Sequence, residues 1–172
     1  MNHVFENQDG WRKVVQEFNN KSDRAAAILG AAFLGAHLSQ VMSAFFLENC
    51  DEAVALLDVD GPLGSLTARV KAAYCMGLIS ANEYHDLNLI MQIHHVFANE
   101  VDGAAFTDNG IREKCFMLRI PREVLLPGET RTPRQLFVFA TAVLTQHLSW
   151  RSVQAEHHRR MIPDDFSLVD VA

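Results

Sequence analysis

Hydrophobic side chains recur along the chain with the spacing of α-helices, and no run of alternating β-branched residues bounded by turns predicts a strand. The longest apolar run covers residues 25–47 and contains no Asp, Glu, Lys or Arg. Ser22 precedes it as an expected N-cap. A second long run follows Thr132, Pro133 and Gln135, which combine a capping box with a first-turn proline. We therefore expect two long apolar helices in the core.

Shorter amphipathic helices are predicted around these two runs. A first helix is expected through Trp11–Phe18, and a short one capped by Asp51. A third follows the turn at 60–62 and is expected to bury Leu66, Val70 and Tyr74. A fourth begins with a capping box of Ser80 and Glu83 and is expected to bury Tyr84, His94 and Phe97, and a short fifth runs from Thr107 or Asp108 to Phe116. Residues 118–131 are expected to form an irregular connection, because Pro and Gly interrupt the pattern there.

The predicted fold class is all-α, a single-domain bundle of about six to eight helices over residues 1–172. Its 49% apolar and 21% charged residues are typical of a globular chain. Three scattered cysteines are too few for a disulfide framework. The first residues do not resemble a signal peptide, so we expect a cytoplasmic protein. The run at 25–47 could span a bilayer by length, but its Gly, Ser, Gln and His content favours a core helix and no membrane contact.

Charge is distributed unevenly along the chain, whose net charge is −6 at pH 7. Residues 1–111 hold 6 Lys/Arg against 14 Asp/Glu, whereas residues 112–160 hold 9 against 4. An acidic body disfavours non-specific binding of nucleic acid. The basic stretch predicts either a local patch or a solvated face interleaved with glutamates, and we favour the second. Direct DNA contact therefore stays an open alternative.

The sequence lacks the usual motifs of a catalytic or metal site. His94-His95 and His157-His158 are adjacent pairs, which point in different directions on a helix, and no H-E-x-x-H occurs. No glycine-rich phosphate loop and no G-x-S-x-G is present. We expect no metal, no cofactor and no catalytic residue.

A family resemblance lies within residues 60–111. The run Asp60-Gly-Pro-Leu-Gly-Ser-Leu-Thr-Ala-Arg-Val-Lys71 is followed by Tyr74, Gly77-Leu-Ile79, Glu83-Tyr84 and Asp86, then by Phe97-Ala-Asn-Glu100, Ala105-Phe-Thr-Asp108 and Ile111. This order resembles the signature of the mannitol operon repressor family. The resemblance implies an all-helical, cytoplasmic bacterial regulator of transcription without catalytic residue or cofactor.

No predicted helix-turn-helix presents several Arg, Lys, Asn or Gln side chains to a DNA groove. We therefore expect regulation through a protein partner rather than direct base reading, with a homodimer as a further possibility. Candidate partner contacts are Arg69, Lys71, His94, His95, Arg112 and Lys114. Residues expected to be structural are Gly61, Pro62, Leu63, Gly64, Tyr84, Phe97 and Phe106.

Two alternatives remain open at this point. Arg69 is expected either to contact a partner or to pair with Glu83 or Asp86 on the next helix, and we favour the pair. Residues 93–99 are similar in shape to the I-R-N-x-F-A-H motif of HEPN domains, with His94 at the Arg position and Asn99 at the His position. That likeness implies a partner-binding helical domain of antitoxin or stress type, or else a degenerate ribonuclease.

Overall fold

The computed structural model describes residues 18, 21–100, 103–124 and 131–165, and all regular structure in these ranges is helical. The elements are α2 (Asp23–Phe45), α3 (Asp51–Leu57), α4 (Leu66–Cys75), α5 (Ala81–Asn99), α6 (Asn109–Met117), α7 (Ile120–Val124) and α8 (Pro133–Glu156). The predicted all-α class is confirmed. The helix expected through Trp11 lies outside the described residues, apart from the buried Phe18.

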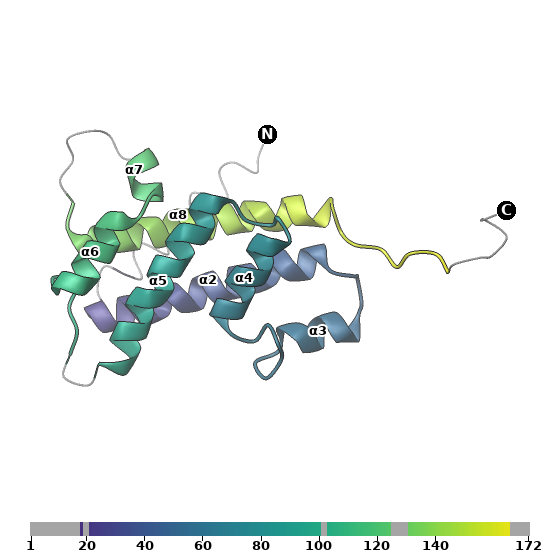
Figure 1. The fold of residues 1–172 in the computed structure, drawn as a ribbon, viewed down its shortest axis with the longest axis horizontal. Helices are drawn as coiled ribbons and strands as arrows, with labels where there is room; N and C mark the ends of the chain where they lie inside the picture. The colour runs from purple at the N-terminus through teal and green to yellow at the C-terminus, as the bar shows by residue number, and fades with distance from the viewer. Residues whose placement is uncertain (1–17, 19–20, 101–102, 125–130, 166–172) are drawn as a thin grey trace.

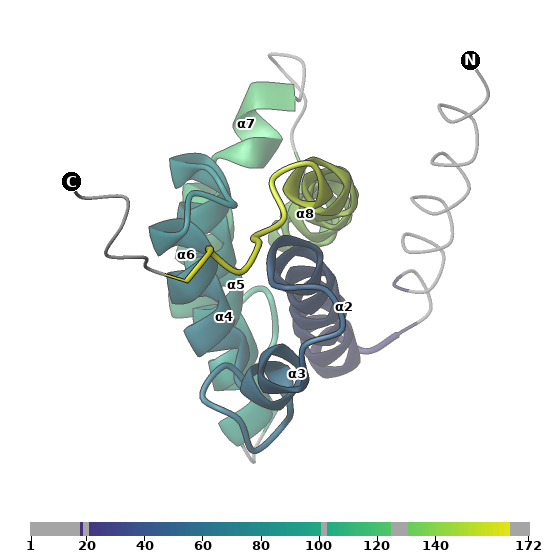
Figure 2. The same ribbon diagram turned by 90° about the vertical axis from the view of Figure 1, so that its right-hand side faces the viewer.

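The two long helices predicted from the apolar runs, α2 and α8, lie side by side and form one layer of the bundle (Figures 1 and 2). Helices α4, α5 and α6 form the second layer, with α3 beside α2 and α7 beside α8 at the edges (Figure 2). The core lies between the layers. Fully buried side chains from both layers include Leu34, Leu38, Leu87, Ile90, Phe97, Phe137 and Leu144.

Glycine and alanine allow α2 to pack closely on two sides. A Cβ at Gly30 would lie 3.3 Å from the ring of Phe137 and from Thr141, both on α8. On another side, a Cβ at Gly35 would lie 3.9 Å from Leu66 of α4. Helix α2 is long and apolar enough to cross a membrane, but half of its most apolar window is buried by other helices. Its composition is therefore accounted for by packing inside the bundle.

Three predicted helix starts are confirmed. Ser22 accepts a hydrogen bond from the backbone N–H of the third residue of α2. Ser80 with Glu83, and Thr132 with Gln135, make both hydrogen bonds of a capping box. The expected cap at residue 51 is displaced by one position, because α3 begins at residue 51 itself.

The predicted irregular connection over 118–131 is wrong in its first part, because α7 occupies Ile120–Val124. The backbone N–H groups of Arg119 and Ile120 donate to the carboxylate of Asp86. These groups have no acceptor inside the short helix, so Asp86 supplies the hydrogen bonds that its N-terminus needs. The start of α7 is therefore fixed by a side chain of α5, and the local sequence pattern around residue 120 does not predict this helix. Residues 125–130 of the predicted connection lie outside the described part of the chain.

One aromatic side chain that the sequence pattern predicts to be buried, Tyr74, is exposed instead. Tyr74 is 43% exposed and stacks on Tyr84 with ring centroids 4.3 Å apart, so the pair covers the contact of α4 with α5 from outside. Phe116, at the end of α6, is 45% exposed. In contrast, Phe97 and Phe106 are buried, and their ring centroids lie 4.9 Å apart in the core.

Candidate functional site

A groove of about 1150 Å³ is lined by residues from α2, α4, α5 and α6. It brings together five of the six candidate contact residues, which are Arg69, Lys71, His94, His95 and Lys114. The sixth, Arg112, is exposed on α6 and does not line the groove. The groove is therefore the place where most of the sequence-predicted contact residues meet.

The floor of this groove is a strip of small side chains on α2. Ala31, Ala32, Gly35 and Ala36 line it, and Ile28 lies farther along the same helix with 41% of its surface exposed. Because these side chains are short, none of them fills the space between α2 and the walls formed by α4 and α5. The result is an open groove with an apolar floor.

The rim of the groove is basic although the protein as a whole is acidic. Lys71 and Lys114 line it, and no Asp or Glu is among the lining residues. The Nζ of Lys114 donates to the carbonyl of Gly110 at 3.2 Å, which holds the ammonium on the α6 side. A local excess of positive charge next to an apolar floor suits a ligand that combines carboxylates with apolar groups.

The two adjacent histidines occupy different environments. His94 is half-buried, and its burial lowers the pKa of the imidazole, with repulsion from His95 as a smaller cause. His95 is exposed, and the Asn99 amide lies 3.2 Å from its Nδ1 and donates to its carbonyl oxygen at 2.7 Å. His94 is therefore neutral at pH 7 and acts in the wall as a polar surface, whereas His95 is accessible from solvent.

Arg69 is a structural clamp at the edge of the groove. Its Nε donates to the carbonyl of Leu63 at 2.7 Å, and its two terminal nitrogens donate to the carbonyls of Leu57 at 2.8 Å and Gly35 at 3.2 Å. The expected pairing of Arg69 with Glu83 or Asp86 is wrong. The planar guanidinium instead connects α4 to α2 and to both ends of the turn before α4.

That turn contains the glycines of the family-like motif. The N–H of Leu63 donates to the carbonyl of Leu56 at 2.9 Å, which closes the loop between α3 and α4. A Cβ at Gly61 would lie 2.2 Å from the carbonyl oxygen of Ala55, and one at Gly64 would lie 2.2 Å from that of Val59. Only glycine fits at such distances, so these residues determine the backbone conformation of the turn. The hydrogen bonds of Arg69 then hold the turn against α4.

A buried carboxylate, Glu83, connects α5 to α8. Its side chain accepts from the backbone N–H of Ser80 at 2.6 Å and from Arg151 at 3.2 Å, and it lies 3.4 Å from Nδ1 of His147. Burial alone would raise the pKa of Glu83, but hydrogen bonds from His147, Ser80 and Arg151 outweigh burial and lower the pKa to about 2. The carboxylate is therefore ionised at neutral pH.

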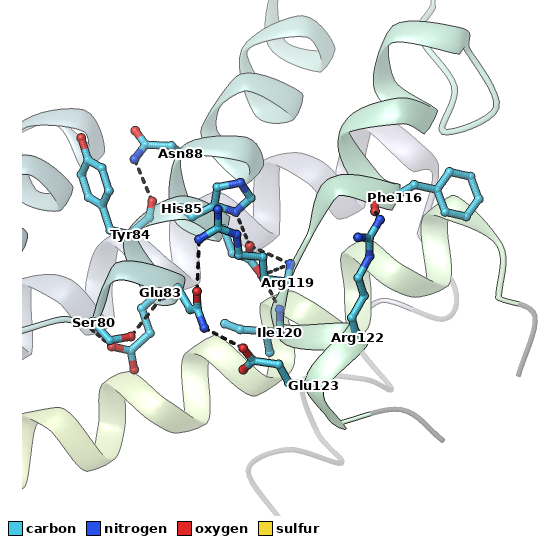
Figure 3. A network of polar contacts seen from close by, with 12 residues as sticks. Ser80, Glu83, Tyr84, His85, Asn88, Phe116, Arg119, Ile120, Arg122 and Glu123 are labelled. Atoms are coloured by element: carbon cyan, nitrogen blue, oxygen red, sulfur yellow. Dashed lines mark hydrogen bonds and ion pairs between the residues drawn. The ribbon is translucent and has the colours of Figure 1, made fainter. Parts of the chain in front are cut away.

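A second buried carboxylate, Asp86, lies one turn farther along α5. It accepts from the N–H groups of Arg119 and Ile120 at 2.9 Å and from Nδ1 of His85 at 2.8 Å. Figure 3 labels His85 on α5 and Arg119 and Ile120 at the start of α7, whose nitrogens make these contacts. The sequence predicts Glu83 as a cap and both Glu83 and Asp86 as possible partners of Arg69, but it does not predict the contacts of Asp86 with the start of α7. Two acidic residues three apart on the inner side of a helix were the available signal.

The arginines of the basic stretch have separate partners. Arg134 pairs with Asp23 at the start of α2, and Arg151 pairs with Glu83. Arg160 lies over the ring of Phe45 at 5.6 Å. The interpretation of this stretch as one solvated face is therefore wrong for Arg134 and Arg151, which connect helices to one another, whereas Arg160 is exposed.

Comparison with known proteins agrees with the helical architecture and the motif. Residues 13–163 match the family model described as mannitol repressor. Mannitol operon repressors from Escherichia coli strains K12 and O6:H1 are each 43% identical over 56 residues, which is 33% of this chain and 29% of theirs. The match thus spans under a third of the length of these curated relatives.

Two solved structures share the fold. The chain in the X-ray structure of the MtlR–HPr complex from Escherichia coli has a TM-score of 0.68 and 23% identity, over 82% of this chain and 99% of that one. A possible transcriptional regulator, YggD from Shigella flexneri 2a, has a TM-score of 0.63 and 13% identity, over 82% and 95%. The chain therefore shares the all-helical fold of these two proteins. With the match over 13–163, the chain belongs to the mannitol repressor family.

Proposed function

We propose that this chain is a cytoplasmic transcriptional regulator of the mannitol-repressor type that acts by binding a protein partner and does not read DNA bases directly. The family match over residues 13–163 carries the proposal. Two ion pairs support the absence of direct DNA reading. Arg134 pairs with Asp23 and Arg151 pairs with Glu83, so these two arginines are not available to contact DNA phosphates. No catalytic role, cofactor or metal is part of the proposal.

The groove is the proposed contact surface. Lys71, His95 and Lys114 would contact an acidic segment of the partner, with His94 in the wall and Arg69 as support. Charge complementarity of this kind mainly sets the association rate and the choice of partner. Within the described ranges no group of three or more His, Cys, Asp or Glu could hold a metal ion, and Asn99 offers no general acid or base. A protein-binding function therefore fits the groove better than ribonuclease chemistry.

The first partner to test is HPr, because the solved relative is described in complex with HPr. Calorimetric titration of purified HPr into the full chain is expected to give a saturable complex, and a fragment carrying the mannitol operator is expected to give no sequence-specific shift. Absence of HPr binding together with a salt-sensitive, sequence-specific DNA shift would overturn the proposal.

The location of the contact needs its own variants. Lys71→Glu with Lys114→Glu reverses two charges inside the groove, and Arg112→Glu reverses one charge on the exposed side of α6 as the control outside the groove. We expect roughly tenfold weaker partner binding for the groove variant and an unchanged affinity for the control. Equal affinities in all three proteins would retain a protein-binding regulator but remove the groove as the contact surface.

A further inference from the structure

We propose that the groove of one copy of this chain receives residues 161–165 of a second copy, so that two chains exchange their C-terminal segments. This inference rests on the groove being a docking surface, as proposed above, and names one occupant for it. It is carried by the conformation of the segment and by the match between its chemistry and that of the groove.

The donor segment is anchored at its base and exposed beyond it. The N–H of Arg160 donates to the carbonyl of Phe45 at 2.9 Å, and the guanidinium of Arg160 covers the Phe45 ring. The next two side chains are large and apolar, yet Met161 is 86% exposed and Ile162 is 78% exposed. Exposed apolar side chains beside a fixed anchor are available to contact another molecule.

The chemistry of the segment complements that of the groove. Met161 and Ile162 are followed by Pro163 and then by Asp164 and Asp165. Residues 161–172 contain three Asp and no Lys or Arg. Pro163 favours an extended backbone, which costs less conformational entropy to bind than a flexible one. Two apolar side chains would cover the alanine floor, and the carboxylates would face the basic rim.

The geometry points to a second copy rather than to the same chain. The segment leaves the bundle beside the C-terminal end of α2, at Phe45, whereas the groove lies along residues 28–36 of that helix. In Figure 1 the segment after α8 points away from the helices. An exchange between two copies uses each groove and each segment once, which gives a closed twofold dimer.

The test is the oligomeric state of the full chain, measured by sedimentation velocity at concentrations of roughly 1 to 100 µM. We expect a monomer–dimer equilibrium that the synthetic peptide of residues 161–172 shifts toward monomer, whereas a scrambled peptide of equal charge does not. Met161→Ser with Ile162→Ser, on a segment outside the core, is expected to weaken dimerisation at least roughly tenfold.

A charge exchange makes the test specific to this pairing. Asp164→Lys with Asp165→Lys, and separately Lys71→Asp with Lys114→Asp, should each weaken the dimer, and the fourfold variant should restore it. A protein that stays monomeric throughout, or a dimer that none of these changes affects, would overturn the exchange. HPr and the segment of a second copy would compete for the same groove, so HPr binding by a chain that stays monomeric retains the proposed function and removes only this inference.

Discussion

Neutralising the buried carboxylate of Glu83 is expected to lower the free energy of unfolding by an amount that depends on pH. Glu83→Gln keeps the shape of the side chain but removes the charge that Arg151 and His147 contact. The pKa of Glu83 is lowered from 4.5 to about 2. A shift of this size corresponds to about 3 kcal/mol of stability in favour of the ionised form.

The sign of the pH dependence follows from the lowered pKa. Because the folded-state pKa is below the unfolded-state value, the stabilisation is fully present above about pH 4.5 and is lost as the pH falls toward 2. The difference between the wild-type protein and Glu83→Gln should therefore be about 3 kcal/mol near pH 7 and about 1.5 kcal/mol near pH 3.

Urea unfolding followed by circular dichroism measures this difference. The matched control is Glu123→Gln, which removes an exposed carboxylate that accepts a hydrogen bond from Asn82. We expect the control to change stability by less than about 0.5 kcal/mol at each pH. The reasoning is refuted if Glu83→Gln costs less than about 1 kcal/mol near pH 7, or if its cost is the same at both ends of the pH range.

Three further predictions concern the clamp, the turn and the thiols. Arg69→Lys should lower the free energy of unfolding by about 2 kcal/mol, measured by urea unfolding. A lysine ammonium cannot make the three hydrogen bonds that the planar guanidinium donates to the carbonyls of Leu63, Leu57 and Gly35. Gly61→Ala should lower the melting temperature, with a cost above about 2 kcal/mol, whereas Gly110→Ala, whose Cβ meets nothing within 4 Å, should not. A thiol reagent at pH 8 should modify the exposed Cys75 quickly, and Cys115 only on unfolding, because burial raises the pKa of the Cys115 thiol to about 12. Mass spectrometry of the labelled sites reads out the order.

Features encoded by neighbouring residues could be predicted from the sequence. Ser22, Ser80 and Thr132 act within three residues of their own positions, so the starts of α2, α5 and α8 are visible in the sequence. The class of the fold follows from the spacing of apolar residues in the long helices. Five residues of the groove could be named as candidate contacts from the sequence, but their convergence depends on how α4, α5 and α6 pack against α2.

Features encoded by distant residues could not be predicted. Helix α7 starts where it does because Asp86, 33 residues before Arg119, accepts its first N–H groups. Arg69 contacts carbonyl groups instead of the expected carboxylate, because the end of α3 and the turn after it direct the oxygens of Leu57 and Leu63 toward it. Side chains that bind backbone groups of remote segments leave no periodic signal in the sequence, since any residue type can supply the carbonyl or the N–H.

The central claim, that the chain regulates by protein contact through its basic groove, is tested most directly by capture from cell lysate. The tagged wild-type protein and the Lys71→Glu, Lys114→Glu variant are compared, each with and without nuclease treatment. The account predicts a protein that co-purifies with the wild type in equal amount with and without nuclease, and that the variant fails to retain. Recovery of nucleic acid alone, lost on nuclease treatment, or equal recovery of the protein by both forms, would contradict it.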